Sequence, residues 1–278
     1  MRHVLSVTVL HVFLPALAFG LIATTAADRS FVAVPVLAAV VTLASLAAGF
    51  LFYRALPVLN RLPRPALGVL VLSAGFGNVT YLGLPVITET LGREYGYVAI
   101  LYDLLATTPA LMTLGVFLAA RYGNGRSVPF TASVMRVLKL PPLWAVAAGI
   151  AVHLFSLPVP AALLDAVTLM GKAVIPVMIF TVGLALDFKD LARLYIAVPA
   201  IGIKLIGAPV FAWWTGRQLG LTAGQLQAVT LEGAMPVMVL SLIIADEFDL
   251  DVPLAATCIT VSTVASFFTV PMMMNILF

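Results

Sequence analysis

The chain has 278 residues, of which 62% are hydrophobic and 10% are charged, and its mean hydropathy is +1.13. Soluble globular domains carry roughly 25% charged residues, so this composition excludes a soluble enzyme or binding domain and predicts an all-α polytopic membrane protein. The formal charge of +3 reflects loop residues and does not predict a surface for nucleic acid.

Apolar runs of the length that crosses a bilayer as a helix, about 20 residues, occur nine times. Seven of these predicted spans are continuous and two are interrupted. In chain order they are Val4–Thr24, Phe31–Leu56, Pro65–Leu91 (interrupted), Tyr95–Ala120, Pro141–Leu157, Ala161–Leu186, Leu191–Leu219, Ala223–Phe248 (interrupted) and Pro253–Phe278. We interpret the first run as a retained helix, because no convincing small-residue cleavage site follows it.

The two interruptions are rich in glycine, proline and polar side chains. The first reads S-A-G-F-G-N-V-T-Y-L-G-L-P (Ser73–Pro85) and the second reads L-E-G-A-M-P-V (Leu231–Val237). Non-helical backbone persists at membrane depth only where it is buried in protein or lines a wet cavity, because unpaired peptide groups are costly in lipid. Interrupted helices in corresponding places of two halves predict the binding site of a transporter.

Lysine and arginine are concentrated in alternate loops. With the N-terminus inside, ten of the fifteen basic residues fall in inner loops, three in outer loops and two within spans. The positive-inside rule therefore predicts a cytoplasmic N-terminus and, for nine spans, a C-terminus outside. The short loops and the Ala-, Leu- and Val-rich composition suit a prokaryotic inner membrane.

The two halves of the chain resemble each other. V-F-L-P-A-L-A-F (Val12–Phe19) aligns with A-V-I-P-V-M-I-F (Ala173–Phe180), and Gly77 of the first interruption aligns with Gly233 of the second at an offset of 156. Four spans of the first half find counterparts in the second, whereas Pro141–Leu157 finds none. This pattern predicts an ancestral architecture of two inverted five-helix repeats, with ten helices in all. The nine predicted spans of this chain lack the first of these helices.

We therefore divide the chain into a first repeat of four spans at residues 1–120, a cytoplasmic linker at 121–140 and a second repeat of five spans at 141–278. An odd number of spans in the ancestral repeat gives the two halves opposite topology. Inverted repeats that each contain a broken helix are typical of secondary transporters.

The first interruption supplies a group of candidate substrate-binding residues. Asn78 has an amide that both donates and accepts, so it suits either a ligand carboxylate or the free backbone groups of the broken helix. Thr80 and Tyr81 lie beside it. Gly77, directly before Asn78, is a further candidate. Gly83 and Pro85 explain why the helix opens, through permissive dihedral angles and a missing donor respectively.

Two carboxylates lie within predicted spans and are candidates for coupling to protons or a cation. Glu232 belongs to the second interruption, and an acidic side chain at membrane depth faces the bundle interior or water. It is a proton carrier, a cation ligand or the partner of a buried lysine. Asp103 is the second candidate, with Thr107 and Thr108 about one turn further along the same helix.

Lys204 is a cation in the middle of a span. V-A-V-P (residues 32–35) aligns with I-A-V-P (residues 196–199) at an offset of 164, which makes Val40 the counterpart of Lys204. Because the charge has no counterpart in the first half, it suggests a counter-ion for an anionic substrate or for Glu232. The alternative is a lysine that snorkels along a cavity wall.

Other chemistry is not indicated. The single Cys258 excludes an internal disulfide and thiolate metal sites, the three histidines lack metal-ligand spacing, and no nucleophile motif occurs. The sequence therefore predicts a protein that is not an enzyme, with no metal and no cofactor. The acidic group Asp246–Asp251 is interpreted as a solvated loop face.

Three motifs together resemble the auxin efflux carrier family. They are G-N-V-T-Y-L-G-L-P (Gly77–Pro85), A-M-P (Ala234–Pro236) and A-D-E-F-D-L-D-V-P-L-A-A-T (Ala245–Thr257), and the likeness runs along the whole chain. The resemblance implies ten helices in two inverted repeats, an architecture similar to that of bile-acid sodium symporters. The chain departs from this pattern by beginning at what would be the second helix.

The resemblance also implies a mechanism and a set of site residues. In the family, a transport bundle slides against a scaffold bundle, and two proline-broken helices cross at the substrate site. By this comparison the crossing contains Asn78, Pro85, Ala234, Met235 and Pro236. Members move organic anions such as malonate, malate or auxin without a prosthetic group.

We therefore predict a secondary transporter of small organic anions that works by elevator-type alternating access in the lipid bilayer. Its partners are the anion and a proton or sodium gradient, and a homodimer is a candidate assembly. One alternative is a sodium-coupled symporter or cation antiporter of related fold. The other is a non-transporting membrane subunit or sensor.

Overall fold

The computed structural model describes residues 2–55, 62–125, 128–188 and 193–278. Parts of the predicted spans and inner loops lie outside these ranges, among them the span ends Leu56 and Leu191 and the basic loop residues Arg61, Arg126 and Lys189.

The described residues are almost entirely helical, and no strand occurs among them beyond one isolated bridge. In chain order the elements, with π- and 3₁₀-helical segments marked η, are α1 (Arg2–Thr8), η1 (Val9–Phe13), α2 (Leu14–Thr24), α3 (Ser30–Ala55), α4 (Arg64–Gly75), η3 (Val79–Gly83), α5 (Leu84–Thr90), η4 (Arg93–Tyr95), α6 (Gly96–Tyr102), η5 (Asp103–Thr107), α7 (Thr108–Ala110), η6 (Leu111–Gly115), α8 (Val116–Tyr122), α9 (Phe130–Leu138), α10 (Pro141–Leu154), α11 (Ala161–Lys172), α12 (Val174–Gly183), α13 (Leu194–Gly202), η7 (Ile203–Gly207), α14 (Ala208–Gln218), α15 (Ala223–Gly233), α16 (Leu240–Glu247) and α17 (Val252–Leu277).

Five helical stretches within the described residues are long and apolar enough to span a membrane. They are Ser30–Ala55, Arg93–Tyr122, Ala161–Gly183, Leu194–Gln218 and Val252–Leu277. A sixth results if α9 and α10, which meet at a bend of 62°, count as one span. The two interrupted spans are each divided, into α4 with η3–α5 and into α15 with α16, where the sequence predicts them to break. The count of nine spans, the inverted repeats and the division into domains stay predictions.

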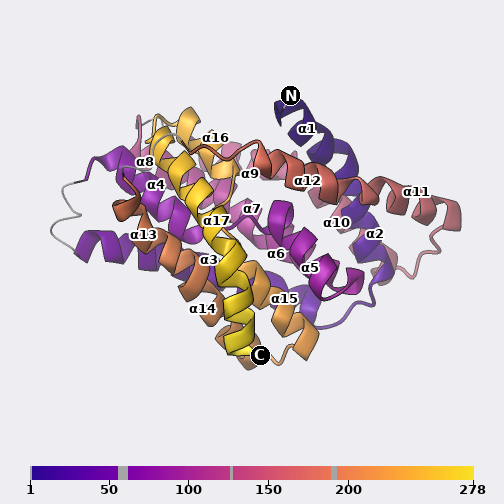
Figure 1. Ribbon diagram of the computed structural model, residues 1–278. Coiled ribbons are helices and arrows are strands. Elements are labelled where there is room, and N and C mark those ends of the chain that lie inside the picture. Colours follow the sequence, from indigo (N-terminus) through magenta and orange to yellow (C-terminus); the bar gives the residue numbers. More distant parts are fainter. Residues whose placement is uncertain (1, 56–61, 126–127, 189–192) are drawn as a thin grey trace.

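The helices form two groups that lie side by side in Figure 1. The smaller group contains α2, α10, α11 and α12, with α2 packed against both α10 and α11. The larger group contains the two broken helices together with α3, α6, α13, α14 and α17. The groups meet where α12 contacts η3 and α2 contacts α6, so the first break lies at their boundary. The two termini lie at opposite ends of the view in Figure 1.

Four π-helical segments precede prolines by the same spacing. The segments η1, η3, η5 and η7 each end two residues before a proline, at Pro15, Pro85, Pro109 and Pro209 respectively. A proline lacks the backbone N–H that an α-helix bonds to the carbonyl four residues earlier. In a π-helical turn the backbone hydrogen bonds join residues five apart, so different N–H and C=O groups are paired. The helix therefore continues through all four prolines. Gly83 and Pro85 do not open the first interrupted span as the sequence predicts, because the break lies at residues 76–78.

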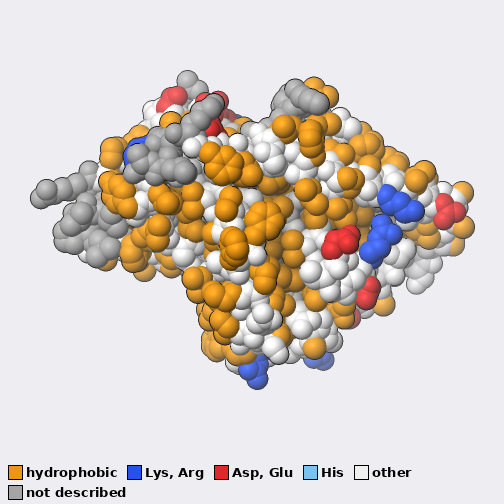
Figure 2. Space-filling model, in the orientation of Figure 1, with side chains coloured by type: hydrophobic (Ala, Val, Ile, Leu, Met, Phe, Trp, Pro, Cys, Tyr) orange, Lys and Arg blue, Asp and Glu red, His pale blue; other side chains and the backbone are white. Residues whose placement is uncertain are grey.

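Hydrophobic side chains spread over most of the face seen in Figure 2, while charged groups lie at its top and bottom edges and in its right-hand part. Large apolar residues are exposed on several elements, for example Phe267 on α17 and Trp144 on α10. Contiguous exposed apolar surface of this kind marks a membrane-facing protein.

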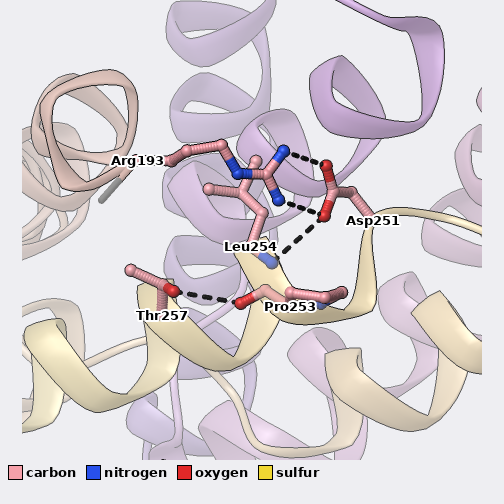
Figure 3. A network of polar contacts seen from close by, with 5 residues as sticks. All are labelled: Arg193, Asp251, Pro253, Leu254 and Thr257. Atoms are coloured by element: carbon pink, nitrogen blue, oxygen red, sulfur yellow. Dashed lines mark hydrogen bonds and ion pairs between the residues drawn. The ribbon is translucent and has the colours of Figure 1, made fainter. Parts of the chain in front are cut away.

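The acidic group Asp246–Asp251 is exposed at Asp246, Glu247 and Asp249, as a solvated face should be, but members of the group are also paired. Figure 3 shows Arg193 forming two hydrogen bonds of 2.6 Å with the Asp251 carboxylate, which also accepts from the Leu254 N–H as the N-cap of α17. Glu247 forms an ion pair with Arg136 of α9 at 2.7 Å. The acidic side chains thus fasten α9 and α13 to the α16–α17 turn, a role that the sequence could not show because the arginines are distant in the chain.

Candidate functional site

The two broken helices meet where each leaves the helical conformation. One antiparallel bridge pairs Gly77 with Val237. Beside it, the Asn78 N–H donates to the Pro236 carbonyl at 2.7 Å. Backbone groups that the breaks release are therefore satisfied by the other break rather than by water or lipid, as an unwound segment in a membrane requires.

The crossing has a local two-fold symmetry in its backbone. The bond from Asn78 to Pro236 has a counterpart of 3.0 Å from the Met238 N–H to the Phe76 carbonyl. Each residue of one bond lies 160 positions from its equivalent in the other, 78 from 238 and 76 from 236. Gly77 thus pairs with Val237 across the crossing, whereas the sequence alignment matches Gly77 with Gly233 as equivalents in the predicted repeats, which stay a prediction.

Lys204 is buried against both breaks. It lies in η7, its side chain is 3% exposed, and its Nζ donates to the Gly233 carbonyl at the end of α15 at 2.6 Å. A Cβ at Gly77 would lie 2.5 Å from the Lys204 Cε and 2.9 Å from Nζ. Because Gly77 has no side chain, there is room for the lysine. The lysine donates to the Gly233 carbonyl, which lies at the end of α15 and has no partner within that helix.

Glu232 is fully buried and its two carboxylate oxygens have no hydrogen-bond partner within the described part of the chain. The carboxylate lies against Gly83, where a Cβ would be within 2.6 Å of both oxygens. Its charge interacts with those of Lys204 and Asp103. Because an unsolvated carboxylate is costly to bury, this group is poised to take up a proton or a cation.

Asp103 is held by two threonines. Its Oδ1 accepts from the Thr108 hydroxyl at 2.7 Å, and its Oδ2 accepts a short hydrogen bond from the Thr80 hydroxyl. The other threonine of the predicted pair, Thr107, donates to the Tyr102 carbonyl instead. Thr80 is therefore placed as a partner of Asp103, and this bond connects the first broken helix to η5.

The side chain of Asn78 does not cap the broken helix. Its backbone carbonyl, rather than its amide, accepts from the Leu82 and Gly83 N–H groups. Its Nδ2 is buried without a hydrogen-bond partner among the described residues. The amide donor is thus available to a ligand at the crossing.

With this geometry in place, the comparisons with known proteins are informative. A family described as "Membrane transport protein" matches residues 1–274. The chain belongs to this family. The match agrees with the motif resemblance to auxin efflux carriers.

Two archaeal relatives carry similar descriptions. An "uncharacterized transporter" of Methanothermobacter thermautotrophicus is 31% identical over 205 residues, which are 73% of this chain and 66% of that protein, just under two thirds of its length. An "uncharacterized transporter" of Methanocaldococcus jannaschii is 25% identical over 268 residues, which are 95% of this chain and 85% of that protein. The chain is therefore similar to proteins described as transporters and is an integral membrane protein of a transport family.

The remaining predicted site residues of this membrane transport protein lie on the same two breaks. Ala234 and Met235 are 1% exposed and continue from α15 into the crossing. Pro85 is buried in the first turn of α5. Tyr81 is half-buried and packs against the hydrophobic cluster around α2, α3 and α6.

Two polar side chains that bond to the backbone of other elements, one of them at the crossing, are not among the predicted site residues. The Ser262 hydroxyl of α17 accepts from the Val237 N–H at 3.0 Å. The buried Tyr53 hydroxyl donates to the Ile196 carbonyl at 2.6 Å and accepts from the Ala200 N–H at 3.1 Å, so it enters the backbone ladder of α13. The nearby mid-helix proline of α13 is the one signal in the sequence for such an insertion.

A polar network also fixes the loop before α3, outside the spans. Asp28 accepts from the Ser30 N–H at 2.8 Å and from the Gln225 amide at 3.0 Å, and the Tyr97 hydroxyl contacts both of those residues. Burial alone would raise the pKa of Asp28, but the hydrogen bonds from Ser30 and Gln225 outweigh it and hold the pKa below its ordinary value of 3.8.

A cavity of about 410 Å³ adjoins the second break. It lies between α5, α15 and α17. Its lining residues are Leu82, Val86, Thr90, Leu91, Leu231, Met235, Pro236, Thr263, Ser266, Phe267, Val270, Pro271, Met274 and Asn275. The α17 residues among them were not predicted as site residues, because their polar members are scattered among apolar ones without a break in the helix.

Proposed function

We propose that this membrane transport protein is a secondary transporter of a small organic anion that works by alternating access. The observation that carries the proposal is the crossing, where two broken helices bring an unpartnered amide, a buried ammonium and a buried carboxylate together. Transporters of this type bind substrate where discontinuous helices meet.

The anion binds at the crossing in this proposal. Asn78 donates its free Nδ2–H to the substrate carboxylate, and Lys204 supplies the compensating positive charge. The second halves of the broken helices begin at Val79 and Leu240, and their N-terminal ends contribute partial positive charge.

In this proposal Glu232, together with Asp103, couples transport to an ion gradient. The Glu232 oxygens lack hydrogen-bond donors among the described residues, so a proton or a cation is the group that compensates the charge. The ion adds positive charge at the crossing, and the anion bound near Lys204 adds negative charge. Binding of the ion and binding of the anion are therefore coupled.

The moving parts are the two groups of helices. The smaller group, α2 and α10–α12, acts as the scaffold, and the larger group carries the crossing past it. This division is supported by the position of η3, which contacts α12 at the boundary. We also place the N-terminus inside and the C-terminus outside a prokaryotic inner membrane, on the distribution of lysine and arginine.

The test is uptake of labelled malonate, malate and phenylacetate into proteoliposomes with imposed pH or Na⁺ gradients. Asn78→Ala should abolish saturable uptake without loss of folded protein. Thr215→Val is the matched control, because it also removes a buried polar atom without a partner but lies on α14 away from the crossing. Uptake that survives Asn78→Ala would remove the proposed role of the amide.

The same experiment separates the alternatives. Dependence on Na⁺ at fixed pH would identify a sodium-coupled symporter, and dependence on pH at fixed Na⁺ would identify proton coupling through Glu232 or Asp103. No uptake or counterflow in any condition, from protein that unfolds cooperatively, would refute transport and favour a membrane subunit or sensor.

A further inference from the structure

A second cavity, of about 430 Å³, lies where α4 begins and α8 ends. Two arginines line it, Arg64 at the first position of α4 and Arg121 in the last turn of α8. The eleven residues from Arg64 to Gly75, where α4 enters the crossing, correspond to about 17 Å at 1.5 Å per residue. This cavity is therefore distinct from the proposed substrate site, and its volume suits a small ligand.

The walls of the cavity are held in place by close packing and by backbone hydrogen bonds. A Cβ built on Gly68, one turn into α4, would lie 2.7 Å from the Cβ of Tyr122, so only a glycine lets the end of α8 approach α4 this closely. After α8 the chain turns back, because the Gly125 N–H donates to the Ala120 carbonyl at 3.1 Å with Gly125 at a positive φ of 73°. The cavity is thus formed before any ligand arrives.

The positive charge of the two arginines is not compensated within the described part of the chain. Both side chains are exposed, and neither guanidinium forms a hydrogen bond or an ion pair among the described residues. The acidic side chain that bonds to a lining residue, Asp249, accepts from the Asn124 amide at 2.9 Å instead. The first turn of α4 and the last turn of α8 have dipole contributions of opposite sign, so the arginines decide which charge the cavity attracts.

The cavity also has an apolar side that faces the lipid. Arg121 is the penultimate residue of the helical stretch Arg93–Tyr122, which is long and apolar enough to span a membrane, so its guanidinium lies at the level of the headgroups. Phe117, one turn earlier on α8, lines the same cavity and is 64% exposed. A basic pocket between membrane helices at this depth is a characteristic site for anionic headgroups, whereas a soluble anion needs no apolar wall beside its charge.

We propose that this cavity binds the headgroup of an anionic phospholipid. The guanidinium groups of Arg64 and Arg121 donate to the oxygens of the phosphate, a geometry that arginine matches better than lysine. Phe117 packs against the glycerol and the first methylene groups of the acyl chains. The bound lipid then joins α4 to α8 at the membrane surface.

The experiment measures lipid preference by native mass spectrometry of the purified full chain. The protein is incubated with equal amounts of phosphatidylglycerol and phosphatidylcholine that carry the same acyl chains, and the two bound populations are compared. The test variants are Arg64→Gln, Arg121→Gln and Arg121→Lys. Arg54→Gln is the matched control, because Arg54 is an exposed arginine in the last turn of α3, on the same predicted side of the membrane, and does not line the cavity.

We expect the unmodified chain to prefer phosphatidylglycerol, and each glutamine variant of the cavity to lower that preference by about fivefold. Arg121→Lys should keep part of the preference, because the charge remains while the two-pronged geometry is lost. Arg54→Gln should leave the preference unchanged. The unfolding temperature without lipid should be the same for all variants, since the arginines have no partners among the described residues whose loss could destabilise the fold.

Two results would overturn the proposal. Equal binding of the two lipids, or an equal loss of preference in Arg54→Gln and in the cavity variants, would show that general surface charge and not this cavity attracts the lipid. Displacement of bound phosphatidylglycerol by inorganic phosphate would assign the cavity to a soluble anion instead. Because no arm of the experiment measures uptake, the result stands or falls independently of the proposed transport function.

Discussion

The close approach of Glu232 to Gly83 leads to a sharp prediction for Gly83→Ala. A methyl group at this position would lie within 2.6 Å of both carboxylate oxygens, so the buried side chain of Glu232 must move. Overpacking of this kind costs typically about 1–3 kcal/mol. Replacing glycine by alanine in a helix gains roughly 0.5–1 kcal/mol, so the net effect should be a loss of up to about 2 kcal/mol in the free energy of unfolding.

Gly207 offers a closely matched control. It ends η7 two residues before a proline, as Gly83 ends η3, but nothing lies within 4 Å of a Cβ built on it. Gly207→Ala should therefore stabilise the protein by the helix-propensity gain alone. Thermal unfolding in detergent, monitored by circular dichroism, should show opposite shifts for the two variants. Equal or stabilising shifts for both would show that the Glu232 carboxylate does not lie against Gly83.

Four further outcomes are expected. Tyr53→Phe should cost about 1–3 kcal/mol in the free energy of unfolding, because it leaves two backbone groups of α13 without their partner, and chemical denaturation measures this. Asp251→Ala should lower the unfolding temperature more than Asp251→Asn, since asparagine still caps a helix. Lys204→Met should destabilise the wild-type chain more than a Glu232→Gln chain, and a double-mutant cycle should give a coupling of about 0.5–3 kcal/mol. Asp28 has a lowered pKa in the folded state. The contribution of its carboxylate to the free energy of unfolding is therefore complete above the unfolded pKa of 3.8 and is lost as pH falls through the folded pKa. The difference in unfolding temperature between wild type and Asp28→Asn should shrink as pH falls through this range.

The sequence locates the crossing well because its signals are local. Glycine, asparagine and proline within an apolar run identify a break in a membrane helix, and the structure has α4 end at Gly75 and α15 end at Gly233, within the predicted interruptions. Which residues then pair across the break is not local. The register depends on how the two helices approach in space, so the sequence does not show that Gly77 pairs with Val237.

The partners of buried and charged groups are the part that the sequence could not supply. The bond of Lys204 to a backbone carbonyl, the bond of Thr80 to Asp103 and the insertion of Tyr53 into α13 all join residues from different helices. Membrane helices that are apolar on nearly every side have little amphipathic pattern from which a facing direction could be read. Burial on a particular side therefore becomes visible only in the packed structure.

The crossing combines a symmetric backbone with asymmetric side chains, and this contrast bears on how it works. A local two-fold rotation exchanges its two backbone hydrogen bonds. Each break therefore donates one bond to the other break and accepts one from it. In the repeats predicted from the sequence Lys204 has no charged equivalent, because the alignment at an offset of 164 assigns Val40, which is 40% exposed, to the matching position. A two-fold exchange does not cancel charge, so the N-terminal ends of the two second half-helices both favour an anion. We expect the single ammonium, opposed by Glu232, to strengthen that preference, and Lys204→Met to weaken anion binding while the backbone pairing that joins the breaks persists.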